Sequence, residues 1–275
     1  MLDWIATATG ARAASCTERI QTLWSGYGEI VRVALDGGIA PTAIVKRVQP
    51  PAHARDTVSD RRKRRSYDVE TAFYRDLAPR CDDTCRVARL YASQVTDEGW
   101  HLVLEDLDAA GYPDRRDDAT GVALDACLRW LASFHARFLG EPCAQLGTYW
   151  HLATRLEELP AIADPALRAA APAIDAQLSA ARFQTILHGD PKEANFCFTR
   201  DGRAVAAVDF QYTGRGCGMK DVAYLLHGRR DDPAAHLETY FQHLRAAPEL
   251  EAEWRALYSI AVRDFQRFLA GWRPR

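Results

Sequence analysis

The 275-residue chain has no run of about 18 apolar residues, the length that crosses a bilayer as a helix, so we expect no membrane span. Residues 1–14 lack a basic stretch followed by an apolar one, so we expect no secretory signal. Basic charge is not in excess either, because 35 lysines and arginines face 37 aspartates and glutamates. That balance disfavours a dedicated nucleic-acid-binding protein. Together these absences predict a cytoplasmic globular protein.

The chain also has no complete set of cysteine and histidine pairs for a zinc site, and few of its basic residues are lysines. Cys81 and Cys85 have no second Cys/His pair to complete a zinc site, so we expect all seven cysteines to be free thiols. Lysine is a compact point charge, whereas arginine is a planar fork. In an arginine-biased chain a lysine can therefore mark a position that arginine cannot fill. Only four basic residues are lysine: Lys46, Lys63, Lys192 and Lys220.

The first hundred residues predict mostly antiparallel sheet with one helix. Two β-prone runs, 30–35 and 43–48, are separated by Asp-Gly-Gly, a strong hairpin-turn signal. Residues 67–77 carry apolar side chains at helical spacing. Further strands are expected at 86–94 and 101–107, with a turn between them.

The remainder predicts a mainly helical region, beginning near residue 107. An apolar stripe over 124–138 predicts a core helix, and an alanine-rich stretch over 149–181 predicts a second helical region. The tail from residue 233 is again helical in pattern. Short strands are expected at 185–187, 196–198 and 204–208.

Five consecutive basic residues, 61–65, stand immediately before the helix predicted at 67–77. Such a run is typical of nucleic-acid or nuclear-import patches. Because the chain as a whole is slightly acidic, we expect a solvated loop here. Contact with an anionic substrate or partner is the alternative.

The clearest functional signal is the sequence His-Gly-Asp-Pro-Lys-Glu-Ala-Asn, which begins at His188 and has the spacing of a kinase catalytic loop. An apolar strand ending in Asp209 follows, 19 residues after Asp190. Phosphoryl transfer needs an oriented hydroxyl, metal-holding oxygens and positive charge on the phosphates. Asp190 can orient the hydroxyl, Lys192 can neutralise the moving group, and Asn195 and Asp209 are hard ligands suited to Mg²⁺. We expect His188 to be a hydrogen-bonding strut.

These motifs resemble the aminoglycoside phosphotransferase and choline kinase branch of the protein-kinase-like superfamily, in which His-Gly-Asp replaces His-Arg-Asp. Asp-Phe-Gln at 209–211 is most similar to ecdysteroid-kinase-like (CHK-like) proteins. The resemblance extends over residues 24–226 and implies an ATP site. It assigns Lys46 to the α/β-phosphates and Glu70, 24 residues later, to pairing with that lysine. The remaining nucleotide-binding residues that it implies are Gly26 and Gly28 in a shortened glycine loop, and Leu104, Glu105 and Leu107 in an adenine-holding hinge.

The resemblance implies an α+β, bilobal protein-kinase-like fold. Residues 1–105 would form a small, mostly antiparallel β lobe with one key helix, and residues 106–275 a larger, mainly helical lobe. Only 11 residues separate Asp209 from Asp221, and no Ala-Pro-Glu follows, whereas a protein kinase needs a longer activation segment.

The sequence therefore predicts a small-molecule kinase that passes the γ-phosphoryl group of MgATP to a hydroxyl of a small metabolite or drug-like acceptor. The alternatives are an ATP-binding pseudokinase or scaffold and a protein kinase. The acceptor and the oligomeric state are not predicted.

Overall fold

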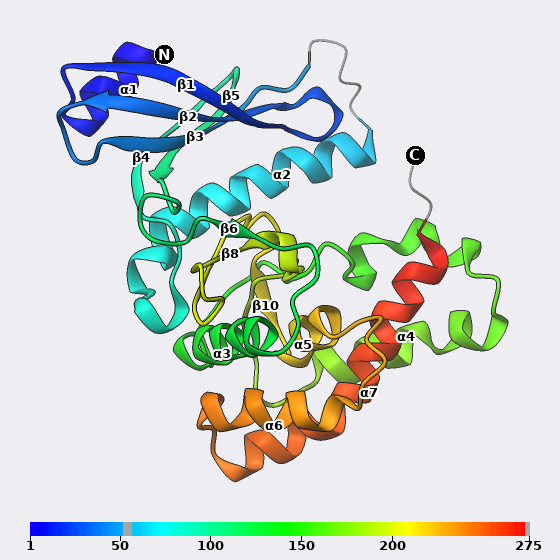
Figure 1. The fold of residues 1–275 in the computed structure, drawn as a ribbon. Coiled ribbons are helices and arrows are strands. Elements are labelled where there is room, and N and C mark those ends of the chain that lie inside the picture. Colours follow the sequence, from blue (N-terminus) through cyan, green and yellow to red (C-terminus); the bar gives the residue numbers. More distant parts are fainter. Residues whose placement is uncertain (52–56, 273–275) are drawn as a thin grey trace.

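A five-stranded antiparallel sheet forms the upper part of the molecule in Figure 1, in the order β1-β2-β3-β5-β4. The structure is a computed structural model that describes residues 1–51 and 57–272. The three inner strands, β2, β3 and β5, lie close to the runs 30–35, 43–48 and 101–107 that the sequence predicted. The strand bounds are β1 Ala13–Thr22, β2 Gly28–Asp36, β3 Thr42–Val48, β4 Leu90–Thr96 and β5 Gly99–Glu105.

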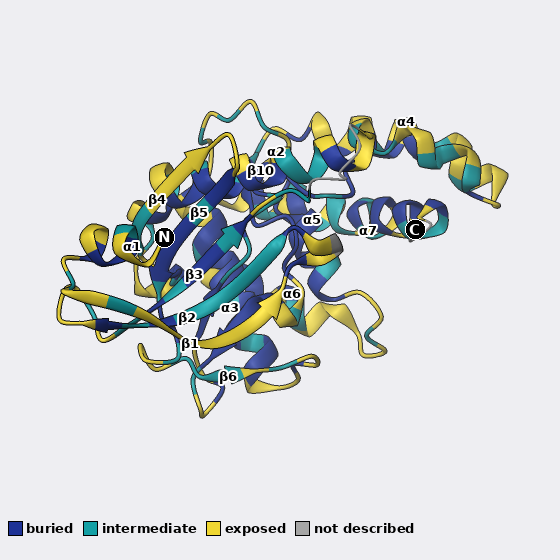
Figure 2. Cartoon of the chain, turned by 90° about the horizontal axis from the view of Figure 1, so that it is seen from above, coloured by how far each residue is buried: buried dark blue, intermediate teal, exposed yellow. Residues whose placement is uncertain are grey.

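The first strand and the helix before it, α1 Leu2–Thr9, were not predicted from the sequence. Strand β1 is an edge strand that is exposed along nearly its whole length, in contrast to the buried β5 (Figure 2). It therefore lacks the alternation of apolar and polar residues that marks a half-buried strand. Helix α1 covers the outer face of the sheet, where Ile5 packs with Val33, Val45 and Val103.

Helix α2, Val58–Ala72, begins nine residues earlier than expected and continues as a π-helical turn, Phe73–Leu77. The prediction of a loop at 61–65 was therefore wrong. Thr57 caps the helix, because its side chain accepts a hydrogen bond of 3.1 Å from the backbone N–H of Asp60. Arginine and lysine are also good helix formers, so this basic run extends the helix instead of interrupting it.

The basic run links α2 to the lower lobe. Arg62 forms an ion pair of 2.6 Å with Glu157 and donates a hydrogen bond to the backbone carbonyl of Thr154. Arg65 donates to the side-chain oxygen of Gln145 at 2.6 Å. These contacts join the two parts of the molecule on one side of the sheet.

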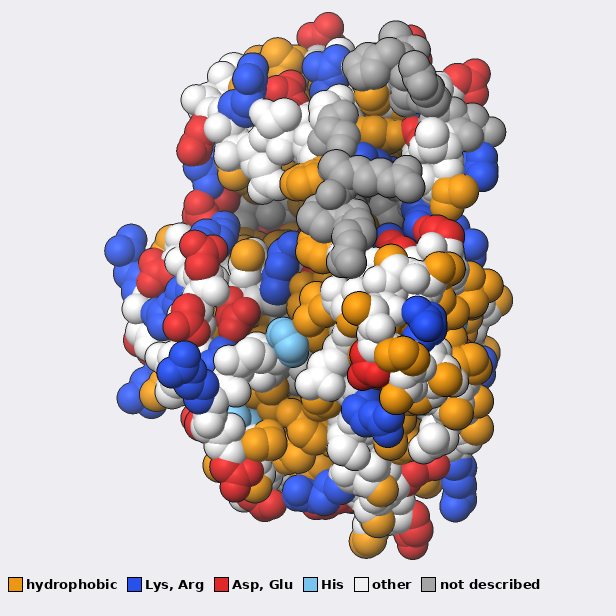
Figure 3. Space-filling model, turned by 90° about the vertical axis from the view of Figure 1, so that its right-hand side faces the viewer, with side chains coloured by type: hydrophobic (Ala, Val, Ile, Leu, Met, Phe, Trp, Pro, Cys, Tyr) orange, Lys and Arg blue, Asp and Glu red, His pale blue; other side chains and the backbone are white. Residues whose placement is uncertain are grey.

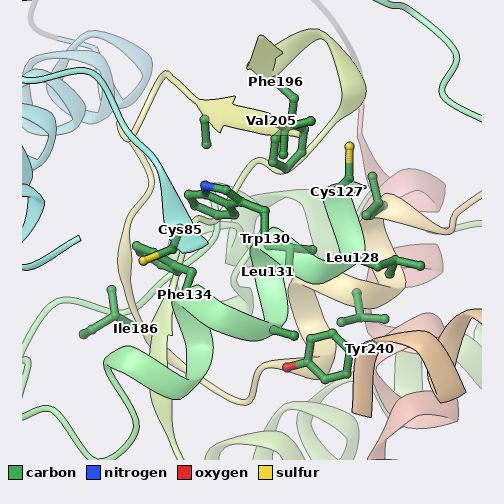
Figure 4. Packing of buried hydrophobic residues seen from close by; sticks show 14 of the residues in the cluster. Cys85, Cys127, Leu128, Trp130, Leu131, Phe134, Ile186, Phe196, Val205 and Tyr240 are labelled. Atoms are coloured by element: carbon green, nitrogen blue, oxygen red, sulfur yellow. The ribbon is translucent and has the colours of Figure 1, made fainter. Parts of the chain in front are cut away.

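The lower lobe packs around α3, whose Trp130, Leu131 and Phe134 are fully or almost fully buried. Figure 4 shows these side chains meeting Phe196 of a short strand and Tyr240 of a later helix. The predicted stripe over 124–138 is thus core. The helix bounds are α3 Val122–Arg137, α4 Pro165–Ser179, α5 Met219–Leu225, α6 Pro233–Leu244 and α7 Pro248–Gly271, and the short strands are β6 Asp114–Arg115, β7 Thr185–Leu187, β8 Phe196–Phe198, β9 Val205–Ala207 and β10 Gly214–Gly216.

The region 149–181 is less regular than predicted. It opens with two 3-10 segments, Leu152–Thr154 and Leu156–Ala161, and only then continues as α4. Asp164 caps α4 by accepting a hydrogen bond of 2.8 Å from the N–H of Ala166. A proline follows the cap at the first helical position, where its missing N–H is not needed.

The architecture confirms the predicted α+β class, with an antiparallel sheet and its helix above a mainly helical lobe (Figure 1). All seven cysteines are free. Within residues 1–51 and 57–272, no helix combines the length and apolar character that spanning a bilayer requires.

Candidate active site

Lys46, Glu70 and Asp209 come together from three distant segments. Strand β3 carries Lys46, α2 carries Glu70, and Asp209 follows β9. The Lys46 Nζ lies 2.7 Å from the nearer Glu70 oxygen and 3.2 Å from Asp209 Oδ1. Lys46 and Glu70 are only 5% and 2% exposed, whereas the Asp209 side chain is 34% exposed. One ammonium group therefore faces two carboxylates, and one of these reaches the surface.

Lys46 and Asp209 stabilise each other's charged form. Burial alone lowers the pKa of Lys46, but the nearby carboxylates of Asp209 and Glu70 outweigh it and raise that pKa. Burial alone raises the pKa of Asp209, but Lys46 outweighs it and lowers that pKa. Lys46 thus stays protonated and Asp209 ionised near neutral pH. Burial raises the pKa of the third member, Glu70, against the opposing effect of Lys46.

Asp190 is held by a set of donors that surround its carboxylate. Its Oδ1 accepts a hydrogen bond of 2.8 Å from the hydroxyl of Tyr224. Its Oδ2 accepts one of 3.1 Å from Asn195 Nδ2 and lies 3.3 Å from Lys192 Nζ. The Asn195 amide also donates to the backbone carbonyl of Asp190 at 2.8 Å, which closes the loop on itself.

His188 is a buried strut, as the sequence predicted. Its Nε2 lies 3.0 Å from the carbonyl of Val208, and its Nδ1 lies 3.3 Å from the backbone N–H of Asp190. The carbonyl can only accept, so Nε2 carries the proton and Nδ1 accepts. Burial lowers the pKa of His188, so the ring is neutral at physiological pH. The His188 ring therefore connects the loop that holds Asp190 to the segment that leads from β9 into Asp209.

Asp221 anchors the same loop from below. Its fully buried carboxylate accepts hydrogen bonds from the backbone N–H groups of His188 at 2.7 Å and Gly189 at 3.1 Å. The ring of His135 lies 3.2 Å away through Nε2, while its Nδ1 lies 2.7 Å from the hydroxyl of Tyr240. This network fixes the start of the loop in the core of the lower lobe.

Asn195 and Asp209 are neighbours in space, because the N–H of Val208 bonds the carbonyl of Asn195 at 2.9 Å. Asp209 has a φ of 66°, in the left-handed region that few non-glycine residues occupy and that recurs at functional sites. The Asn195 amide nitrogen donates to Asp190, so its amide oxygen is the atom that could serve as a metal ligand. An amide oxygen and a carboxylate fit Mg²⁺, which takes one or two protein ligands when phosphates supply others.

In the glycine loop, backbone packing requires a glycine at position 28. A Cβ on Gly28 would lie 2.0 Å from the carbonyl oxygen of Arg47, so the close approach of β2 to β3 demands glycine there. Gly26 has a φ of 72° with open space around it, so it serves the turn. The role of both in holding phosphates stays a prediction.

The predicted hinge residues lie at the end of β5 and just beyond it. Leu104 is buried in the main core, and Leu107 is buried with it. The side chain of Glu105 accepts from Arg86 at 2.5 Å and from the N–H of Arg89 at 3.0 Å. Glu105 therefore braces the hinge with its side chain, and its backbone N–H also donates to the carbonyl of Arg89 at 2.8 Å. The contact of the hinge with adenine stays a prediction.

Sequence reasoning did not single out Tyr224, although its hydroxyl bonds Asp190 directly. Tyr224 lies on α5, three residues after Asp221 in the chain. Nothing in the spacing marks it, because a tyrosine at a helix position is most often a packing residue. Its position after an anchoring aspartate is the one signal that could have drawn attention to it.

The family profile of phosphotransferase enzymes matches residues 19–257. The chain belongs to this family. No curated protein sequence gives a significant match.

Two solved structures show the same fold. An aminoglycoside-3'-phosphotransferase of type VIII is 18% identical, with a TM-score of 0.52 and coverage of 90% of this chain and 93% of that one. Aminoglycoside phosphotransferase APH(3'')-Id from Streptomyces rimosus, in complex with ADP and streptomycin, is 16% identical, with a TM-score of 0.53 and coverage of 88% and 91%. The predicted bilobal protein-kinase-like fold is thus confirmed for this phosphotransferase family member.

Proposed function

We propose that this protein is a small-molecule kinase that transfers the γ-phosphoryl group of ATP, with Mg²⁺, to an alcohol. The observation that carries the proposal is the contact of Lys46 with both Glu70 and Asp209, next to a loop that holds Asp190. We also propose that the boundary of the lobes lies between residues 105 and 106. On this proposal the enzyme works in the cytoplasm, and the Asp-Phe-Gln sequence at 209–211 favours a CHK-like member of the family.

On this proposal, each residue of the site has its own role. Lys46 holds the α- and β-phosphates, and Glu70 keeps its ammonium in place. Asn195 and Asp209 would hold Mg²⁺, which would supply positive charge to neutralise the phosphates. Backbone groups of the hinge hold the adenine.

Asp190 accepts a hydrogen bond from the acceptor hydroxyl and orients its oxygen toward the γ-phosphorus. A new oxygen–phosphorus bond forms as the bond to the β-phosphate oxygen breaks, and the hydroxyl proton passes to Asp190. Burial raises the pKa of Asp190, although the nearby Lys192 lowers it in part, so this carboxylate is a better proton acceptor than an exposed one. On this proposal, Lys192 faces the phosphoryl group as it is transferred.

Thermal melting with and without MgATP tests the nucleotide site. At about 100 times its Kd, a ligand stabilises the native state by roughly 2.7 kcal/mol. We expect a rise in Tm that needs Mg²⁺ in the natural protein and that disappears in Asp209→Ala, because the substitution removes a metal ligand.

The control is Asp201→Ala, which removes an exposed carboxylate from a turn between β8 and β9 and should keep the full rise. Each variant is compared with itself without nucleotide, so any loss of intrinsic stability cancels. A protein that shows no rise with MgATP or MgGTP would rule out the kinase proposal.

The pH dependence of transfer tests the role of Lys192. Transfer needs ionised Asp190, so the rate falls as the pH falls through the pKa of that carboxylate. Lys192 lowers this pKa, so Lys192→Met should move the acidic limb of the kcat profile to higher pH.

Lys192→Arg keeps the positive charge and serves as the matched control, with an acidic limb close to the natural one. If the limb of Lys192→Met stayed in place or moved to lower pH, Lys192 would not act on Asp190. The measurement is ADP release at saturating substrates across the acidic range.

A further inference from the structure

The two residues that follow Asp209 both contact α2 or its π-helical turn. Phe210 is fully buried and stacks on Phe73, with 3.7 Å between the ring centres and 12° between the ring planes. Gln211 Oε1 lies 3.3 Å from the hydroxyl of Ser66. On the face shown in Figure 3, the surface is hollowed between the sheet-bearing part of the molecule and the lower lobe. The segment 209–211 is one of the places where these two parts are in contact.

The positions that this segment contacts lie on one face of α2 and its extension. Ser66, Glu70 and Phe73 are separated by four and three residues, which is the spacing of side chains on one face of a helix. Ser66 and Glu70 are buried, with 4% and 2% of their surface exposed. The contacts of Gln211 and Phe210 therefore lie on either side of Glu70 along the helix.

Gln211 also acts on Glu70 itself. Burial raises the pKa of Glu70, and the side chains of Lys46 and Gln211 oppose that rise. The Ser66 hydroxyl lies 2.8 Å from the carbonyl of Lys63 as well, so its single proton is shared between that carbonyl and Gln211 Oε1. The amide nitrogen of Gln211 is the group that can donate to the Glu70 carboxylate. One glutamine side chain thus connects two buried polar positions of α2.

The orientation of Glu70 sets the position of the Lys46 ammonium. The two carboxylate oxygens of Glu70 lie 2.9 and 2.7 Å from Lys46 Nζ. Asp209 is the second carboxylate beside this ammonium, and in the proposed reaction Asp209 would hold Mg²⁺. Lys46 would then rely on Glu70 to keep its place, so a residue that fixes Glu70 also fixes Lys46.

From these contacts we infer that Gln211 is a positioning residue, which holds Glu70 of α2 against Lys46 so that the ammonium is in place for the α- and β-phosphates of ATP. The inference rests on the proposed function, because it adds a residue to the nucleotide site of the kinase. Gln211 acts through Glu70, and its effect is therefore on the phosphates and not on the adenosine part of the nucleotide.

Calorimetry with MgATP and with adenosine tests the inference on Gln211→Met, which keeps the length of the side chain and removes its polar atoms. Loss of a hydrogen bond to a charged group should raise the Kd of MgATP about tenfold. The Kd of adenosine, which has no phosphates, should stay that of the natural protein. A merely distorted lobe would weaken both ligands. Equal weakening of both, or an unchanged Kd of MgATP, would overturn the inference.

A double-mutant cycle with Glu70→Ala shows whether Gln211 acts through Glu70. Glu70→Ala should itself raise the Kd of MgATP, and adding Gln211→Met should give no further rise, because the residue that Gln211 positions is gone. A second rise of about tenfold in the double variant would mean that the two residues act independently, which contradicts the inference. The matched control is Gln177→Met, the same substitution at an exposed position of α4, and its Kd for MgATP should equal the natural one.

Ser66→Ala provides a second variant in case Gln211→Met does not fold. It removes the hydroxyl that contacts Gln211, so it should raise the Kd of MgATP about threefold and leave adenosine unaffected. A folded Ser66→Ala protein with the natural Kd for MgATP would rule the inference out. A natural protein that bound neither MgATP nor adenosine would overturn the kinase proposal and, with it, the role of Gln211.

Discussion

Asp190→Ala is expected to abolish phosphoryl transfer while nucleotide affinity stays close to that of the natural protein. The acceptor hydroxyl loses the group that orients it and takes its proton, which contributes typically about a hundredfold to ten-thousandfold to a rate. The residues proposed to hold the phosphates and the metal, Lys46 and Asp209, are unchanged in this variant. The measurement pairs kcat from ADP release with the Kd of MgATP from calorimetry.

Two further variants make the result specific to the carboxylate. Asp190→Asn keeps the size of the side chain, and its remaining oxygen can still accept from Tyr224 or Asn195, so it should fold well and be equally inactive. Asp232→Ala removes an aspartate that caps α6 by accepting from the N–H of Ala234 at 2.9 Å, and it should retain full turnover. Turnover within a few-fold of the natural rate in Asp190→Ala would refute the role of Asp190.

The same experiment separates a kinase from a pseudokinase. A natural protein that binds MgATP but releases no more ADP than Asp190→Ala, with every hydroxylated acceptor tested, would be a nucleotide-binding scaffold. A natural protein that releases more ADP than Asp190→Ala would be an enzyme. The intact set of polar residues around Lys46 and Asp190 leads us to expect the second result.

The pairing of Lys46 with Glu70 could be predicted because the order of the motifs carries long-range information. Lys46 and Asp209 lie 163 residues apart in sequence, and no local pattern links them. The spacing around Asp190 and the position of Glu70 matched a known arrangement, and that arrangement places these groups together. The acid–base partners of the site followed from this match and not from periodicity.

Other parts of the molecule depended on tertiary contacts that the sequence does not display. The edge strand β1 is exposed along nearly its whole length, so its sequence shows no regular alternation of apolar and polar residues. The slightly acidic balance of the chain favours a solvated loop for the basic run 61–65. Its helical state depends on the local cap at Thr57 and on contacts such as that of Arg62 with Glu157, and only the second of these needs the folded chain.

Asp221→Ala is expected to destabilise the fold strongly and to lower turnover at the same time. The substitution leaves the backbone N–H groups of His188 and Gly189 buried without an acceptor. Each such loss costs about 1–3 kcal/mol, so the free energy of unfolding should fall by roughly 2–6 kcal/mol. Because His188 begins the loop that holds Asp190, kcat should also fall in the protein that remains folded. Urea unfolding and ADP release at low temperature measure the two effects.

The control for Asp221→Ala is Asp76→Ala, which removes a half-exposed carboxylate bound at 2.7 Å to Arg75. Surface ion pairs contribute about 0–1 kcal/mol, so that variant should unfold near the natural midpoint. Asp221→Asn retains one oxygen that can accept from a single N–H group, so its loss should lie between the two. If Asp221→Ala unfolded no more easily than Asp76→Ala, the loop would be held by other contacts. The anchoring role of this carboxylate would then be excluded, whatever the effect on kcat.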